Sequence, residues 1–331
     1  MAELASSFAK AQSNIEPSDE DWDNAPEAHQ AIADILREDE TLKKWGINPI
    51  LIGSYGRRVS IRRVYDVDMF CRLDDYPEGV TADEVLDRVY EVLVDAYDEE
   101  SVTREDRSVT VLVPDADGLY VDVVPARDAG SVWEIPTEDG EWIATNPVKM
   151  TELKEDKNAD FDEMYVPCVK LLRQARRTLL GKTKPGGFAV EIALFTACEE
   201  GLVTKTTSMT EFFASAMEGV ADVFRRIADD GFEIPDPSMP GEVMVFDDDA
   251  DFATAADKFE SAAADARAAV DMDEDEAGKA ALLIQAILGP NDDFENVFPM
   301  PHGYDKDGNK KASSNRTAGD RKPTPGPLRF G

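Results

Sequence analysis

The chain of 331 residues has few of the side chains on which metal and nucleophile chemistry often depends, with two histidines and three cysteines. The cysteines, Cys71, Cys168 and Cys198, lie far apart in apolar contexts and form no C-x-x-C pair. They are expected to be buried, reduced thiols, and a cysteine-based zinc site is excluded. His29 and His302 are the two histidines of the sequence, and they form no H-D phosphohydrolase motif. Most histidine-based catalysis is therefore excluded.

Long apolar runs and positive charge are also scarce. Without an N-terminal apolar segment or a membrane-length run, the chain is expected to be cytoplasmic and away from membranes. Only 35 Lys and Arg residues stand against 69 Asp and Glu, which gives a net charge of −34. Such a field repels nucleic acid, so DNA binding is not expected. Because self-repulsion of this size is tolerated mainly in salt, we interpret it as salt adaptation in a haloarchaeal type of protein.

The apolar pattern predicts an α+β protein with two folded regions. Residues 1–46 are expected to be helical, with an apolar pattern over 25–45, and a strand, a Gly-Ser turn and the strand that begins at Asp66 follow. Thr81 then caps a helix, and strands follow at 109–113 and 119–124. This order is typical of a small mixed sheet with helices on one side. We therefore predict a sheet-based core with its N-terminal helix over residues 1–150.

Strand signals fade after residue 151, and apolar residues recur at helical spacing. Helices are expected at 187–200, 208–230, 251–270 and 275–288, which makes 151–300 a helical domain. The last segment, 301–331, is rich in Gly, Pro, Ser and Lys and is basic, against the trend of the chain. It lacks the apolar surface to fold alone, so we predict a disordered tail.

Three aspartates carry the strongest functional signal. Asp66 and Asp68 lie two residues apart in an apolar strand, so their side chains share one face. Asp122 lies in a second apolar strand. A chance D-x-D pair is common in so acidic a chain, but carboxylates in buried strands repel one another unless a cation joins them. Together with the turn at Gly53 and Ser54, they predict a Mg²⁺ site for a nucleoside triphosphate.

Three segments together resemble the signature of the polymerase-β-like nucleotidyltransferases: Gly53 to Arg58, Asp66 to Asp68, and Val121 to Pro125. Within that superfamily the chain resembles the CD-NTases, which are synthases of cyclic di- and oligonucleotide messengers. The resemblance covers roughly residues 20–300. Val59 departs from it, since the family usually has threonine there.

Three further segments are similar to the same branch: Glu141 to Pro147, the helix around Lys170, and Gly187 to Glu191. Gly187 stands where the family often has a serine that contacts the nucleotide. The resemblance implies a polymerase-β-like core with a helical domain, two Mg²⁺ ions that Mn²⁺ can replace, and ATP and other NTPs as substrates. Its implied catalytic and metal residues are Asp66, Asp68 and Asp122. The implied nucleotide-binding residues are Gly53, Ser54, Arg57, Asn146, Lys170, Arg173 and Gly187.

The expected function is therefore synthesis of a cyclic di- or trinucleotide messenger in antiphage (CBASS) signalling, with release of pyrophosphate. One alternative keeps the three aspartates and transfers the nucleotide to tRNA or protein. Another is a nucleotide-binding protein without activity, against which the intact acidic triad argues. By resemblance, partners would be an effector activated by the cyclic nucleotide and a ubiquitin-transferase-like protein that conjugates the C-terminal Gly331.

Overall fold

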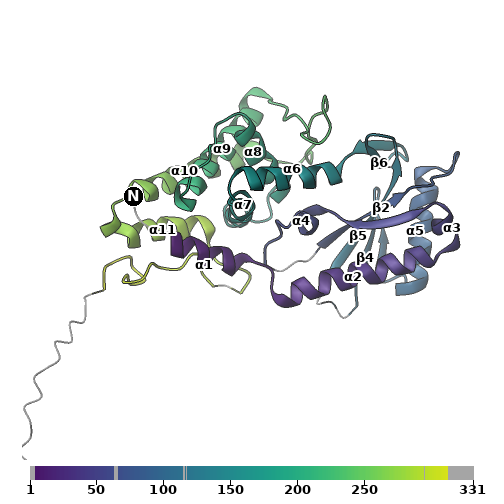
Figure 1. Ribbon diagram of the computed structural model, residues 1–331, viewed down its shortest axis with the longest axis horizontal. Coiled ribbons are helices and arrows are strands. Elements are labelled where there is room, and N and C mark those ends of the chain that lie inside the picture. The colour runs from purple at the N-terminus through teal and green to yellow at the C-terminus, as the bar shows by residue number, and fades with distance from the viewer. Residues whose placement is uncertain (1–3, 63–65, 115, 117, 294, 312–331) are drawn as a thin grey trace, which may run out of the picture.

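The computed structural model describes residues 4–62, 66–114, 116, 118–293 and 295–311, and in this part of the chain it has two lobes (Figure 1). One lobe is built on a β-sheet and the other is helical. The short helix α4 (Gly53–Gly56) lies where the two lobes meet. The α+β class predicted from the sequence is confirmed.

The sheet has seven strands among the described residues, and its centre pairs two strands in parallel. The main order is β1-β2-β5-β4-β3, and β6 and β7 extend it from β5. The strands are β1 (Ile47–Leu51), β2 (Asp66–Leu73), β3 (Val102–Arg104), β4 (Val109–Leu112), β5 (Tyr120–Asp128), β6 (Trp133–Pro136) and β7 (Trp142–Thr145). Only β2 and β5 run parallel, and the other neighbours are antiparallel.

Helices α2 (Asp19–Glu38) and α5 (Ala82–Tyr97) cover one face of this sheet. Apolar residues of both helices share one core with the buried side chains of alternate strand positions, among them Val67, Cys71 and Val123. Thr81 begins α5 with a reciprocal capping box to Glu84, as its position in the sequence predicts. The even-numbered positions of β2 therefore face the other side of the sheet, toward the helical lobe.

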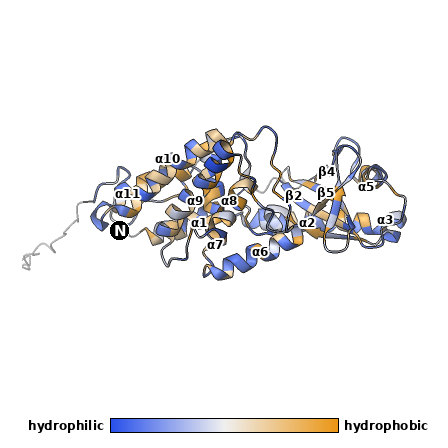
Figure 2. Ribbon diagram, turned by 90° about the horizontal axis from the view of Figure 1, so that it is seen from above, coloured by the Kyte–Doolittle hydropathy of each residue, from blue (hydrophilic) through white to orange (hydrophobic). Residues whose placement is uncertain are grey.

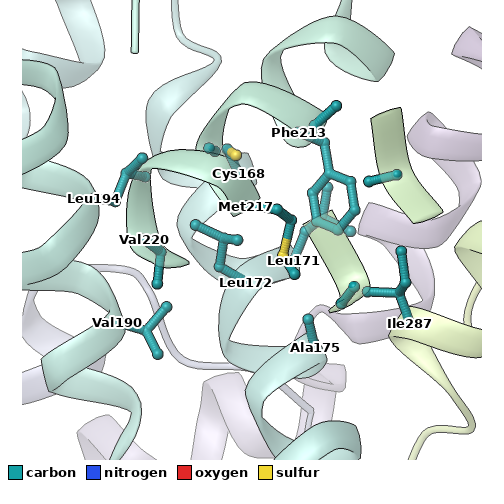
Figure 3. Close-up of a cluster of buried hydrophobic side chains, with 14 of the residues drawn as sticks. Cys168, Leu171, Leu172, Ala175, Val190, Leu194, Phe213, Met217, Val220 and Ile287 are labelled. Carbon is teal, nitrogen blue, oxygen red and sulfur yellow. The ribbon is translucent and has the colours of Figure 1, made fainter. Parts of the chain in front are cut away.

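The helical lobe is packed around α7 (Tyr165–Leu180), α8 (Gly187–Glu199) and α9 (Met209–Asp230). Helices α10 (Phe252–Asp271) and α11 (Ala277–Leu288) complete it, with the short η1 (Glu274–Glu276) between them. Figure 3 shows side chains of α7, α8, α9 and α11 meeting in this core. The four helices expected between 187 and 288 are confirmed within two residues at each end.

A long, largely hydrophilic helix, α6 (Pro147–Asp160), leads from the sheet into the helical lobe (Figure 2). The sequence analysis did not identify it, and it did not identify β3, β6 or β7 either. These strands are three or four residues long, and their stability comes from pairing rather than from their own apolar pattern.

The N-terminus departs from expectation. The structure has three separate helices there, α1 (Ala5–Ile15), α2 and α3 (Glu40–Lys44). Leu4, Phe8, Ala11 and Ile15 belong to the core of the helical lobe rather than to the core of the sheet lobe. The first helix thus belongs to the helical lobe, although it lies within the predicted core of residues 1–150. The reason is that its apolar side chains pack against α7 and α9.

The prediction of disorder from residue 301 onward is wrong for residues 301–311. Tyr304 is buried and donates from its hydroxyl to the carbonyl of Glu274, and Lys310 pairs with Asp275. Gly308 lies directly against Gly278 of α11, where neither residue has a Cβ to keep the chains apart. The remaining tail, with Gly331, lies outside the described residues. Among the described helices, none is long and apolar enough to cross a membrane.

Candidate active site

The three predicted aspartates come together on the face of the sheet that turns toward the helical lobe. Asp68 of β2 is the register partner of Asp122 of β5, and Asp66 is the partner of Tyr120. Parallel pairing aligns the two strands so that these carboxylates extend from one edge of the face. The prediction that Asp66, Asp68 and Asp122 share one face is confirmed.

Asp68 is the most perturbed of these carboxyl groups. Burial and, after it, the neighbouring charges of Asp66 and Asp122 together raise its pKa from 3.8 to about 6. Asp122 accepts a hydrogen bond at Oδ1 from the hydroxyl of Thr110, its register partner on β4. Thr110 therefore fixes the orientation of Asp122, a role that the sequence analysis did not assign.

The glycine before Ser54 is required by the closeness of Asp68. Gly53 has a φ of +64°, and a Cβ at this position would lie 1.6 Å from Asp68 Oδ2. The predicted Gly-Ser turn is in fact the four-residue helix α4, which begins at Gly53. Ser54 follows it, with its Oγ 2.9 Å from Ser60 Oγ. Backbone N–H groups at the start of this helix therefore lie beside the carboxylates.

Arg57 ties the two lobes together. Its Nε and Nη2 donate to the two carboxylate oxygens of Glu191 on α8, at 3.0 and 3.2 Å. Both side chains are buried, and the guanidinium lies over the ring of Phe188. The sequence assigned Arg57 to nucleotide binding, but in the structure both ends of its fork are already occupied. Glu191 ends the segment from Gly187 that resembles the family, but the sequence analysis gave it no role of its own.

Arg173 is the cation of α7 that faces the carboxylates. Together with Arg57 it opposes the rise in the pKa of Asp68. Its own pKa is lowered, chiefly by burial, and its Nε is buried without a hydrogen-bond partner. A Cβ on Gly187 would lie 3.0 Å from its Cζ, so the glycine at this position makes room for the guanidinium.

Two other predicted nucleotide-binding residues are engaged elsewhere. Lys170 is buried, and its Nζ pairs with Glu16 at 2.6 and 2.8 Å. Asn146 caps α6, since its Oδ1 accepts from the N–H of Lys149. The structure thus places Gly53 against Asp68, Arg173 near Asp66 and Asp68, and Gly187 against Arg173. It gives Ser54, Lys170 and Asn146 other contacts.

The donor set fits a divalent cation in its chemistry. Three carboxylates on one face are hard oxygen ligands of the kind that Mg²⁺ prefers, and the raised pKa of Asp68 reflects a repulsion that a cation would relieve. In the described part of the chain, no three His, Cys, Asp or Glu side chains already converge as a metal cage. Binding an ion would therefore draw the carboxylates closer together.

Comparisons with known proteins agree with this geometry. Residues 2–158 match the family described as the Second Messenger Oligonucleotide or Dinucleotide Synthetase domain (SMODS). The chain is also 29% identical over 309 residues to a "Cyclic AMP-AMP-AMP synthase" of Acinetobacter sp., which covers 88% of this chain and 84% of that protein. Together they support the assignment to the SMODS and CD-NTase family that the motifs suggested.

Solved structures show the fold. The chain resembles the CD-NTase CdnG of Bradyrhizobium diazoefficiens in complex with GTP, with a TM-score of 0.64 at 15% identity over 86% of this chain and 96% of that one. It resembles CdnC of E. coli MS115-1 with ATP, with a TM-score of 0.61 at 17% identity over 87% and 98%. These relatives are bacterial and do not support the haloarchaeal origin inferred from charge, which stays a hypothesis.

Proposed function

We propose that this chain is a nucleotidyltransferase that joins NTPs into a cyclic oligonucleotide messenger and releases pyrophosphate. The observation that carries the proposal is the placement of Asp66, Asp68 and Asp122 on one face, with the start of α4 directly against Asp68. Transfer to tRNA or protein is not favoured, because the relatives of the chain are named as cyclic-nucleotide synthases.

In this proposal the three aspartates would hold two Mg²⁺ ions, or Mn²⁺ in their place, which neutralise phosphate charge and activate the attacking hydroxyl. The backbone N–H of Gly53 and the hydroxyl of Ser54 would donate to the terminal phosphates of the donor NTP. Arg173 would oppose the charge that develops on the leaving pyrophosphate, since its buried Nε lacks a partner. Asp122, oriented by Thr110, would accept the proton of the 2′- or 3′-hydroxyl.

For the product we propose an adenine-containing ring, because the curated relative is named for a cyclic AMP trimer. Antiphage signalling through an effector that the product activates is the proposed context. Conjugation of Gly331 by a ubiquitin-transferase-like partner belongs to the same proposal, and it rests on a residue outside the described part of the chain. Deleting Arg329 to Gly331 should leave synthesis intact and remove covalent adducts and signalling in cells that carry the partner.

The decisive experiment is mass spectrometry of the products that the purified chain forms from the four NTPs at high KCl. A cyclic product without added polymer is expected, and it would exclude an obligatory tRNA or protein acceptor. The pair of changes Asp66→Ala and Asp68→Ala should abolish pyrophosphate release. Residual release above a few per cent with Mg²⁺ or Mn²⁺ would refute the role of the aspartates.

A further inference from the structure

A second pocket lies at the junction of the lobes, and the catalytic carboxylates do not line it. It has a volume of about 720 Å³, which lies within the range of small-molecule sites. The sheet lobe contributes Trp22 of α2 and Arg58, and the helical side contributes Lys154 of α6 and Lys170 of α7. Gly53, Asp68 and Arg173 are not part of its wall.

The backbone explains why only one of two adjacent arginines lines this pocket. Arg58 has a φ of +58°, a conformation that side chains other than glycine, asparagine and aspartate seldom adopt. Arg57 extends between the lobes to Glu191, while Arg58 is exposed and lines the second pocket. This turn of the backbone separates the two guanidinium groups although they are neighbours in the sequence.

Lys154 has a longer ion pair than Lys170, the other lysine of the pocket. Its side chain is 5% exposed, and its Nζ lies 3.8 Å from Oε1 of Glu155, whose own side chain is 64% exposed. Burial lowers the pKa of Lys154, the charges of Glu155 and Glu191 oppose this, and the charges of Arg58 and Arg57 act with burial. A largely buried lysine whose ion pair is this long lacks full compensation for its desolvation, and an anion in the pocket would offset that cost.

Three cations gather on this wall, although acids outnumber bases two to one in the chain. Arg58, Lys154 and Lys170 line the pocket together with two acids, Glu155 and Glu163, and both acids lie at its exposed rim. Lys170 already pairs with Glu16. Trp22 adds an aromatic surface, with its ring against Tyr55 at 5.1 Å between centroids.

We propose that this pocket binds a second nucleotide, apart from the catalytic site, with its phosphates on Arg58, Lys154 and Lys170 and its base on Trp22. Guanidinium and ammonium groups are the usual partners of phosphate, and an aromatic ring provides a stacking surface for a base. Because both lobes line the pocket, an occupant would also hold them together. The proposal goes beyond the proposed function and does not depend on catalysis.

The test is titration of the full chain with ATP in EDTA, where the carboxylate site lacks its cation, and at a fixed salt concentration. Saturable quenching of tryptophan fluorescence is expected, and Trp22→Phe should remove the change. Lys154→Met should weaken ATP binding by about tenfold or more, since a charge-assisted contact is lost. Lys149→Met is the matched control, because Lys149 lies on the same helix, exposed and paired with Glu152, and should leave affinity unchanged.

Several results would overturn the proposal. They are the absence of saturable binding, equal affinity in Lys154→Met and the parent, and binding of pyrophosphate as tight as that of ATP, which would leave no role for the base. If Lys154→Met does not fold, Arg58→Asn gives the same test, because Arg58 is exposed and asparagine tolerates its backbone conformation. A chain that binds ATP in EDTA but makes no cyclic product would refute the proposed function and leave this proposal standing.

Discussion

Acidic residues have opposite surroundings in two regions of the molecule. On the helical lobe they are matched by arginines: Arg225 pairs with Asp229, Asp257 and Glu260, and Arg267 pairs with Glu211 and Glu218. On the face of the sheet, Asp66, Asp68 and Asp122 lie near one another, and the pKa of Asp68 is raised. In a chain this acidic, most acidic residues say little about function. Carboxylates that the fold holds close together without a paired arginine therefore indicate the candidate site.

The largest expected effect concerns salt. The arginines of the helical lobe match only part of the 69 acids, so mutual repulsion should unfold the chain in dilute buffer. Charges interact over about 30 Å at 0.01 M salt and about 3 Å at 1 M, so molar KCl should restore the structure. Far-ultraviolet circular dichroism against KCl concentration measures this. A melting temperature that is the same in dilute and molar salt would contradict the salt-adaptation hypothesis.

The next effect is on activity. Gly53→Ala places a methyl group where Asp68 Oδ2 lies and strains a positive φ, so Asp68 must move. We expect a loss of about 100-fold or more in kcat, because small displacements of reacting groups are costly. Gly186→Ala is the matched control for folding, since its Cβ would meet nothing within 4 Å. Normal turnover by Gly53→Ala would show that Asp68 is not held in place by α4.

A smaller effect, on stability, distinguishes the buried ion pair of Arg57 and Glu191 from the ion pairs of Arg225 on the surface. Arg57→Met leaves Glu191 buried without its partner and should cost about 3–5 kcal/mol of unfolding free energy. Arg225→Met, on the exposed face of α9, should cost much less, because solvent screens exposed ion pairs. Denaturant titration at one salt concentration compares them. The pair Arg57→Met with Glu191→Met should recover part of the loss, and similar costs for the two single arginine variants would make the distinction wrong.

The smallest effect is a pH dependence due to Asp68. Because its folded-state pKa, about 6, exceeds the ordinary 3.8, the folded metal-free protein holds the extra proton between these values. Its contribution to stability is therefore present at low pH and is lost as the pH rises through about 6. The melting temperature in EDTA should fall from about pH 4.5 to about pH 7 by more in the parent than in Asp68→Asn. Equal falls in both proteins would show that Asp68 does not titrate in this range.

Sequence reasoning succeeded best where a local pattern is sufficient. The alternation of β2 placed Asp66 and Asp68 on one face, and the capping box at Thr81 and the helices after residue 187 were also read from nearby residues. It failed for β3, β6 and β7, which are too short to show a period, and for residues 301–311, where Tyr304 and Gly308 pack on a helix that the local composition does not reveal.

The sequence by itself determined the chemistry of the site: which residues are carboxylates, which strands carry them, and that a glycine precedes Ser54. Side-chain alternation and turn preferences depend on neighbours along the chain, so they can be read there. Only the tertiary structure decided which cations serve the carboxylates. Lys170 and Arg173 lie one turn apart on α7, yet one pairs with Glu16 and the other approaches the site. The reason is that a partner distant in sequence, not spacing along a helix, determines where a long charged side chain ends.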